Sequence, residues 1–234
     1  MRDDFRYPAS MSLFRAQWLY DVLLESYGTQ GWWPGNDDPH VVCLGALLVQ
    51  RTTWTNAANA LRSLDAAGLM DLNALDACDI DALASCIRSV GFHNAKAQKL
   101  KAFTSFMLER WDGSYANARR AAPTTLRTEL LAVHGIGPET ADAMLTYAFE
   151  MPSFVIDAYT RRILTRMGWI DGRESYEVLQ KRFEDALPSD RLLYAEFHAL
   201  LVQHAKQHCR TAPKCQGCPT AAVCETVNAR GVHE

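Results

Sequence analysis

Apolar residues recur at intervals of three and four along most of the chain, which is the period of an amphipathic helix. The clearest stretches cover residues 44–48, 57–64, 126–133, 141–148 and 194–204. Strand signals are poor by comparison, and neither an internal repeat nor a low-complexity linker interrupts the pattern. The sequence therefore predicts an all-α protein.

Two of these helices are joined by a short turn with two glycines. An apolar stripe ends at Val133, the turn HGIG follows at 134–137, and Pro138 takes a first-turn position of the next helix. Glycine allows a tight turn, and the N–H groups that begin the second helix favour an anion such as a phosphate. A plain pair of helices joined by a glycine turn is the alternative interpretation.

A further helix is expected to begin directly after Asp157. An aspartate in that position is most simply an N-cap, worth about 1 kcal/mol. A second role is open to it, because it follows Glu139 by eighteen residues with the glycine turn just before.

Composition changes this picture little, but the placement of charge matters. The 234 residues are 48% hydrophobic and 22% charged with a net charge of −3, which is ordinary for a globular protein. Residues 88–127 nevertheless hold eight Lys or Arg against two acids, whereas residues 66–81 hold four Asp and no base. Such a basic stretch is typical either of a local polyanion site or of a solvated helix face.

The chain shows no sign of a membrane segment. Its longest uncharged stretch, residues 39–50, is too short to cross a bilayer, and no basic signal region precedes it. We expect a cytoplasmic protein, associated with the nucleoid if the source is bacterial. Without an oligomerisation signal, we expect a monomer.

The seven cysteines fall into two groups. Cys43, Cys78 and Cys86 lie in apolar helical patterns and are expected to pack in the core. The other four form a C-x5-C-x2-C-x5-C run in a loop with glycine and proline, at Cys209, Cys215, Cys218 and Cys224. Four thiolates in such a loop suit a tetrahedral zinc ion or a [4Fe–4S] cluster, and their spacing alone does not choose between them.

Together these segments resemble the helix-hairpin-helix DNA glycosylases of the endonuclease III superfamily. The resemblance rests on LAVHGIGPETAD (131–142), FVIDAYTRR (154–162) and the cysteine loop, in this chain order. LLVQ (47–50) is similar to the family's turn with an intercalating glutamine, and GFHNAKA (91–97) is similar to its G-x-x-x-x-K-A helix start.

The resemblance implies two helical domains with double-stranded DNA bound in a groove between them. Residues 31–151 would form a six-helix barrel that contains the helix-hairpin-helix, and residues 1–30 with 152–234 would form the iron–sulfur cluster domain. The four loop cysteines would bind [4Fe–4S], with zinc as the less favoured alternative, although the first gap is one residue shorter than the usual family spacing. The DNA backbone would contact Gly135, Ile136, Gly137 and Arg161, and Gln50 would fill the space of a flipped base.

Glu139 departs from the family in a way that predicts the reaction type. In the bifunctional endonuclease III enzymes this hairpin position holds a lysine, whose amine forms a Schiff base with the sugar. A carboxylate cannot form that imine. We therefore expect a monofunctional glycosylase, with Asp157 as the essential carboxylate that stabilises the oxocarbenium-like sugar and directs a water molecule.

The substrate is predicted from two adjacent indoles, Trp32 and Trp33. The segment GWWP (31–34) is similar to W-W-P segments of the 3-methyladenine glycosylase branch. Aromatic faces attract cationic alkylated purines, which are also good leaving groups. Packing in the core or at a domain interface is the alternative role of these indoles. Two other functions stay open: a glycosylase for oxidised pyrimidines or mismatches without lyase activity, and a DNA-binding paralogue without catalysis.

Overall fold

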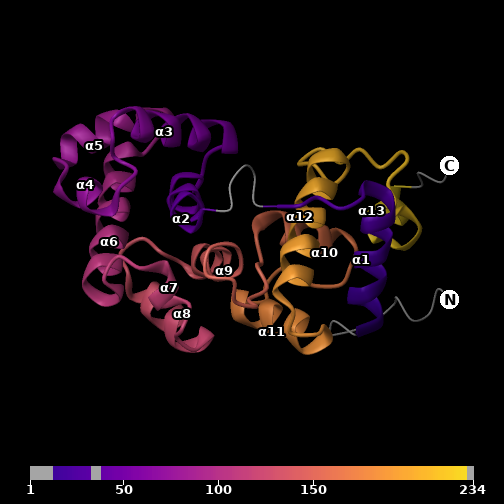
Figure 1. The fold of residues 1–234 in the computed structure, drawn as a ribbon. Coiled ribbons are helices and arrows are strands. Elements are labelled where there is room, and N and C mark those ends of the chain that lie inside the picture. Colours follow the sequence, from indigo (N-terminus) through magenta and orange to yellow (C-terminus); the bar gives the residue numbers. More distant parts are fainter. Residues whose placement is uncertain (1–12, 33–37, 231–234) are drawn as a thin grey trace. The chain divides into compact units, whose positions relative to one another are not determined.

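The computed structural model describes residues 13–32 and 38–230. Every regular element within those ranges is a helix (Figure 1), which confirms the expected all-α class. The chain divides into two compact units, a terminal unit of residues 1–32 and 152–234 and a middle unit of residues 33–151. None of the helices described is long and apolar enough to cross a membrane.

The terminal unit is built around a core of aromatic side chains. Its helices are α1 (Leu13–Tyr27), α10 (Ala158–Arg166), α11 (Tyr176–Ala186), α12 (Arg191–Gln207), η3 (Ala221–Val223) and α13 (Glu225–Arg230). Phe154 stacks on Phe183 with ring centroids 4.2 Å apart. The rings of Tyr194 and Phe197 contact the ring of Phe154 edge-on. Fully burying each such ring contributes about 1.5–3 kcal/mol, so the segment that leads into α10 is anchored firmly.

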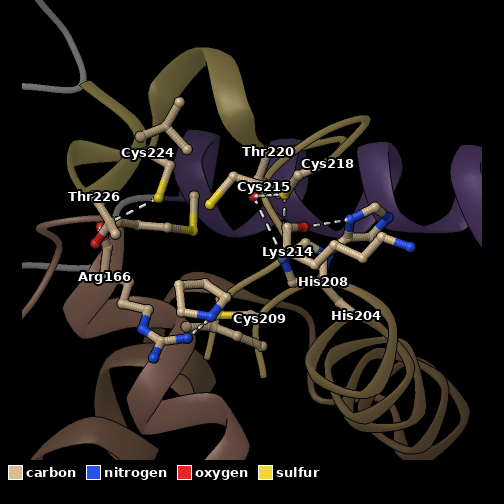
Figure 2. Close-up of a pocket in the computed structure, with 14 residues that line it drawn as sticks. Arg166, His204, His208, Cys209, Lys214, Cys215, Cys218, Thr220, Cys224 and Thr226 are labelled. Carbon is tan, nitrogen blue, oxygen red and sulfur yellow. Dashed lines mark hydrogen bonds between the residues drawn. The ribbon is translucent and has the colours of Figure 1, made fainter. Parts of the chain in front are cut away.

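The chain that follows α12 forms the loop that carries the four clustered cysteines. This loop lines a pocket together with residues from the ends of α10 and α12 and from α13 (Figure 2). His208 ends α12 and holds the loop, because its backbone N–H donates to the carbonyl of His204 and its carbonyl accepts from Arg210 and Lys214.

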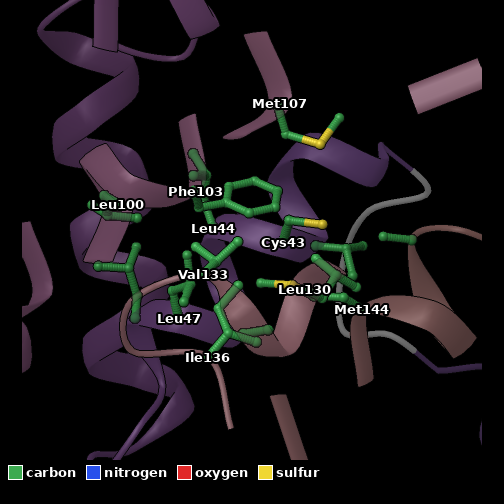
Figure 3. Packing of buried hydrophobic residues seen from close by; sticks show 14 of the residues in the cluster. Cys43, Leu44, Leu47, Leu100, Phe103, Met107, Leu130, Val133, Ile136 and Met144 are labelled. Atoms are coloured by element: carbon green, nitrogen blue, oxygen red, sulfur yellow. The ribbon is translucent and has the colours of Figure 1, made fainter. Parts of the chain in front are cut away.

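The middle unit contains α2 (Pro39–Leu48), α3 (Trp54–Ala66), α4 (Leu72–Ala77), α5 (Ile80–Cys86), η2 (Arg88–Val90), α6 (His93–Trp111), α7 (Tyr115–Ala118), α8 (Pro123–Ala132) and α9 (Pro138–Tyr147). Its core joins α2, α6, α8 and α9 (Figure 3). Leu47 of α2, Phe103 of α6 and Met144 of α9 are all fully buried there. Val133 at the end of α8 and Ile136 in the glycine turn pack into the same cluster, so this core fixes the turn in place.

Helix caps explain much of the acidic stretch. Asp71 accepts hydrogen bonds from the amides of Asn73 and Ala74 at the start of α4, and Asp79 does the same for Asp81 and Ala82 at the start of α5. Such caps are each worth about 1 kcal/mol. These two aspartates are therefore helix-starting residues.

The basic stretch is mostly engaged within the middle unit. Lys96 and Lys101 donate to backbone carbonyls, Arg110 pairs with Glu129, and Arg127 forms a bidentate pair with buried Asp142. Arg119 donates to the carbonyl of Ala148, and Lys99 donates to a side-chain amide. The charge pattern thus reflects tertiary contacts for six of the eight cations.

Candidate functional site

The glycine turn presents the start of α9 toward solvent. Gly135 adopts φ +84°, a conformation that favours glycine, and a Cβ there would also meet the side chain of Lys99. Gly137 is the exposed N-cap residue of α9 and has no side chain to cap the helix. The N-terminus of α9 therefore has no N-cap side chain, and its dipole favours an anion such as a phosphate oxygen there. Ile136, only 5% exposed, serves as the apolar anchor of the turn.

Gln50 lies directly against this turn. Its side-chain amide donates to the carbonyl of Gly135 at 3.1 Å and to the hydroxyl of Thr140 at 3.0 Å. The ammonium of Lys99 donates to the amide oxygen of Gln50. Here the glutamine that the sequence assigned to intercalation holds the turn, so entry into a DNA stack requires these hydrogen bonds to exchange for new ones.

A second turn lies beside Gln50. The buried ammonium of Lys96 donates to the carbonyl of Leu48 at 2.8 Å and to that of Val90 at 3.0 Å, which joins the ends of α2 and η2. Phe92, two residues after Val90, is 68% exposed and adopts φ +47°. Sequence reasoning used this phenylalanine only as part of a helix start, and its exposure could not be read from a single apolar residue.

Glu139 lies in the first turn of α9 with its side chain exposed. An acidic side chain is favourable there, because the helix dipole is positive at its N-terminus. The position therefore carries a solvent-accessible carboxylate next to the glycine turn.

Asp157 is the N-cap of α10, as the sequence predicted. Its Oδ1 accepts a hydrogen bond from the backbone N–H of Thr160 at 2.7 Å, and its Oδ2 lies 3.5 Å from Nε2 of His198 on α12. Burial would raise the pKa of this carboxyl, but His198 and Thr160 outweigh burial and hold the pKa below its usual value. The result is a buried carboxylate that is ionised at neutral pH.

Trp32 belongs to the same cluster. Its ring meets the ring of His198 edge-on, with centroids 5.8 Å apart, and the ammonium of Lys206 lies 5.5 Å from its centroid. One indole face thus already has a cation near it. Trp33, the second predicted indole, lies outside the described residues. His198 was missed by the sequence analysis, because a histidine on an apolar helix stripe carries no distinguishing signal.

Arg161 is committed to a structural contact. Its guanidinium donates to the carbonyl of Glu174 at 2.8 Å, which ties α10 to the segment before α11. Contact with a phosphate therefore depends on its remaining N–H groups, of which a guanidinium has five.

The four clustered cysteines are free thiols that line one pocket (Figure 2). Their sulfurs have polar partners: Arg166 donates to Sγ of Cys209 at 3.4 Å, and the hydroxyl of Thr220 lies 3.4 Å from Sγ of Cys218. Burial raises the pKa of the Cys218 and Cys224 thiols, and the neighbouring cysteines raise both further. A metal centre in the pocket would therefore have to displace the protons of these thiols on binding.

This donor set fits a cofactor ligated by thiolates. Four thiols that line one pocket, with N–H and O–H donors beside their sulfurs, are the donor types that a [4Fe–4S] cluster or a zinc ion requires of the protein. Among residues 13–32 and 38–230, however, no group of three or more His, Cys, Asp or Glu side chains is arranged to hold a metal ion. Ligation would therefore draw the thiolates into a new arrangement.

His204 lies beside the cysteine pocket. Its Nδ1 is 2.9 Å from the hydroxyl of Tyr27 on α1, and its Nε2 is 3.4 Å from the hydroxyl of Thr220. Burial, and then the charge of His208, lower the pKa of His204 to about 4, so its ring is neutral at physiological pH.

The sequence matches a family of known proteins. Residues 44–189 match the model of the HhH-GPD superfamily of base excision DNA repair proteins. A protein of Methanocaldococcus jannaschii, provisionally named as a DNA repair glycosylase, is 40% identical over 207 residues, which cover 88% of this chain and 94% of that protein.

Solved structures show the same likeness. The H. pylori 3-methyladenine DNA glycosylase bound to 1,N6-ethenoadenine superimposes with a TM-score of 0.71 and 28% identity, over 84% of this chain and 98% of the other. A trapped covalent intermediate of endonuclease III with DNA gives a TM-score of 0.82 at 18% identity, over 94% and 99% of the two chains. The second likeness concerns the fold alone.

Proposed function

Because the chain belongs to the HhH-GPD superfamily of base excision DNA repair proteins, we propose that it is a monofunctional DNA N-glycosylase. It hydrolyses the bond between a damaged purine, in particular an alkylated one, and its sugar in double-stranded DNA. The observation that carries this proposal is Asp157, a buried carboxylate whose pKa lies below its usual value.

Asp157 supplies the chemistry of hydrolysis. As the base leaves, the sugar acquires oxocarbenium character, and an ionised carboxylate stabilises that positive charge. The same carboxylate orients the attacking water and accepts its proton. Since this group is ionised at neutral pH, it cannot protonate the leaving base. That favours cationic alkylated purines, which leave without protonation.

Glu139 directs the reaction away from strand cleavage. A carboxylate forms no imine with the sugar, so the product is an intact abasic site. We assign Glu139 to the anionic surroundings of the cationic base and to no covalent step.

We assign contacts to DNA to residues of both units. The amides at Gly135 and Gly137 and the remaining guanidinium N–H groups of half-buried Arg161 in the terminal unit are the proposed phosphate ligands, whereas the amide of Ile136 already donates to the carbonyl of Val133 at 3.1 Å. Flipping a base leaves a gap in the stack, and Gln50 and Phe92 lie on neighbouring turns that could fill it. Trp32 remains a candidate for the base pocket through the ring surface that Lys206 leaves uncovered.

We also propose that Cys209, Cys215, Cys218 and Cys224 hold a [4Fe–4S] cluster, with zinc as the alternative. Bound there, the cluster would cross-link a loop that has little regular structure of its own, and it takes no part in hydrolysis. Arg166 and Thr220 would donate to the thiolates of Cys209 and Cys218.

The direct test measures base release from defined duplexes. We expect the protein to release 3-methyladenine from alkylated DNA, to leave thymine glycol in place, and to yield strand breaks only after alkali treatment. Release of thymine glycol instead would support the second candidate, a glycosylase for oxidised pyrimidines. Binding of the duplex without release of either base would identify a DNA-binding paralogue.

A lysine in place of Glu139 tests the assignment of the hairpin position. We expect Glu139→Lys to form a covalent adduct with DNA that sodium borohydride traps, because the new amine would stand where the lyase amine stands in bifunctional relatives. The side chain is exposed, so the fold should tolerate the change with a loss of about 0.3–1 kcal/mol from the helix dipole.

Glu139→Gln is the matched control for this variant. It removes the same charge without adding an amine, and it should give no trapped adduct. An adduct in the wild type or in the Gln variant would mean that another amine attacks the sugar, and the protein would then not be monofunctional.

A further inference from the structure

We propose that His198 is a positioning residue for Asp157, which fixes the orientation of the carboxylate and preserves its negative charge while the base leaves. The inference rests on the proposed function, because Asp157 is the carboxylate that acts there. It adds to that function a partner on α12, forty-one residues further along the chain.

The carboxylate of Asp157 is held from two sides. Its Oδ1 accepts the backbone N–H of Thr160, and its Oδ2 faces Nε2 of His198 at 3.5 Å. The side chains of Asp157 and His198 are only 11% and 7% exposed. Because each oxygen faces a different helix, rotation of the carboxylate would break both interactions at once.

His198 is itself held in place. It lies in the buried stripe of α12 between Phe197 and Ala199, and its ring packs edge-on against Trp32. Lys206 lies two helical turns further along α12, with its ammonium over the indole. Lys206 is thus a charged group that lies across Trp32 from the pair.

Charge explains why such a partner is needed. A carboxyl group buried without a partner becomes protonated, because burial disfavours the ionised form. A protonated Asp157 could neither stabilise the positive sugar nor accept a proton from water. The interactions of the carboxylate with His198 and Thr160 outweigh the effect of burial and leave the pKa of Asp157 below its usual value.

The first test compares two substitutions by single-turnover kinetics on alkylated duplex DNA. His198→Phe keeps a ring but donates no hydrogen bond, and we expect base release to slow by about 10²-fold through misplacement of the carboxylate. The KM for DNA should stay within twofold. His198→Gln, whose amide can still reach Oδ2, should recover most of the rate. Equal rates for the wild type and the Phe variant would overturn the proposal.

The second test needs no substrate. The pKa of the Asp157 carboxyl, followed by carbon-13 NMR, should rise in the Phe variant and stay near the wild-type value in the Gln variant. An unchanged pKa in the Phe variant would refute the role of His198. If the wild type releases no base at all, the proposed function fails, whereas this titration still decides whether His198 holds Asp157.

A substitution at another buried histidine serves as the control for effects on folding. His40 of the middle unit is 8% exposed and its Nδ1 lies 2.9 Å from the hydroxyl of Tyr115, so His40→Phe reports the general cost of losing a buried imidazole. It should leave the pKa of Asp157 unchanged. If His198→Phe fails to fold, His198→Asn replaces it in both tests, because the shorter Asn amide cannot reach Oδ2 of Asp157. A wild-type rate and an unchanged pKa of Asp157 in the Asn variant would also overturn the proposal.

Discussion

Replacement of Asp157 by Asn is expected to slow release of 3-methyladenine by about 10²- to 10⁴-fold, the usual contribution of a positioned acid or base. The substitution removes the negative charge that stabilises the sugar and the group that accepts the proton of water. Asn is as good an N-cap as Asp, so α10 should still begin at residue 158. The rate is measured under single turnover, and the fold is checked by circular dichroism and thermal unfolding.

Asp190→Asn is the matched control. Asp190 is also an N-cap, accepting from the amides of Leu192 and Leu193 at the start of α12, but it is exposed. Its neutralisation should change neither the rate nor the fold. If Asp157→Asn kept the wild-type rate, Asp157 would be a cap alone, and the DNA-binding paralogue would become the better interpretation.

The stability of the Asp157→Asn variant should also differ from that of the wild type in its pH dependence. The folded-state pKa of Asp157 is lowered, so its ionisation stabilises the fold above the pKa of the unfolded chain. That contribution disappears as the pH falls through the folded-state pKa. The wild type should therefore lose more stability on acidification than the Asn variant.

Replacement of Cys218 by Ser is expected to remove the cofactor of the cysteine pocket. The purified wild type should absorb at about 400 nm and contain about four iron atoms per chain, and the variant should lack both properties. Loss of a ligated centre belongs to the small class of changes that cost on the order of 4–5 kcal/mol, so the thermal unfolding midpoint should fall sharply. Elemental analysis and thermal unfolding measure the two effects.

Cys86→Ser is the control for this variant. Cys86 is also a partly buried thiol, but it packs against the core of the middle unit and does not line the pocket. It should keep the iron, the absorbance and nearly all of the stability. One zinc ion per chain in the wild type would select the alternative ligand, and a wild type that binds neither metal would refute the cofactor proposal.

Local signals in the sequence were reliable wherever one helix end or one short turn decides the outcome. Pro138 begins α9 and Asp157 caps α10 as predicted, because such preferences depend on backbone atoms only two or three residues away. The burial of Cys43 likewise follows from an apolar helix stripe. The basic stretch was different: its charge suggested a surface for a polyanion, yet Arg119 and Arg127 are directed at groups of their own unit.

By itself, then, the sequence determined the all-helical class, the family, the glycine turn and the spacing of the cysteines, since each is a property of neighbouring residues or of their order. The tertiary structure alone decided which distant side chains meet. It placed Lys99 on Gln50 and His198 on Asp157, pairs that no local pattern connects. Such contacts depend on how helices pack and which rotamers their cores allow, and sequence spacing does not encode either.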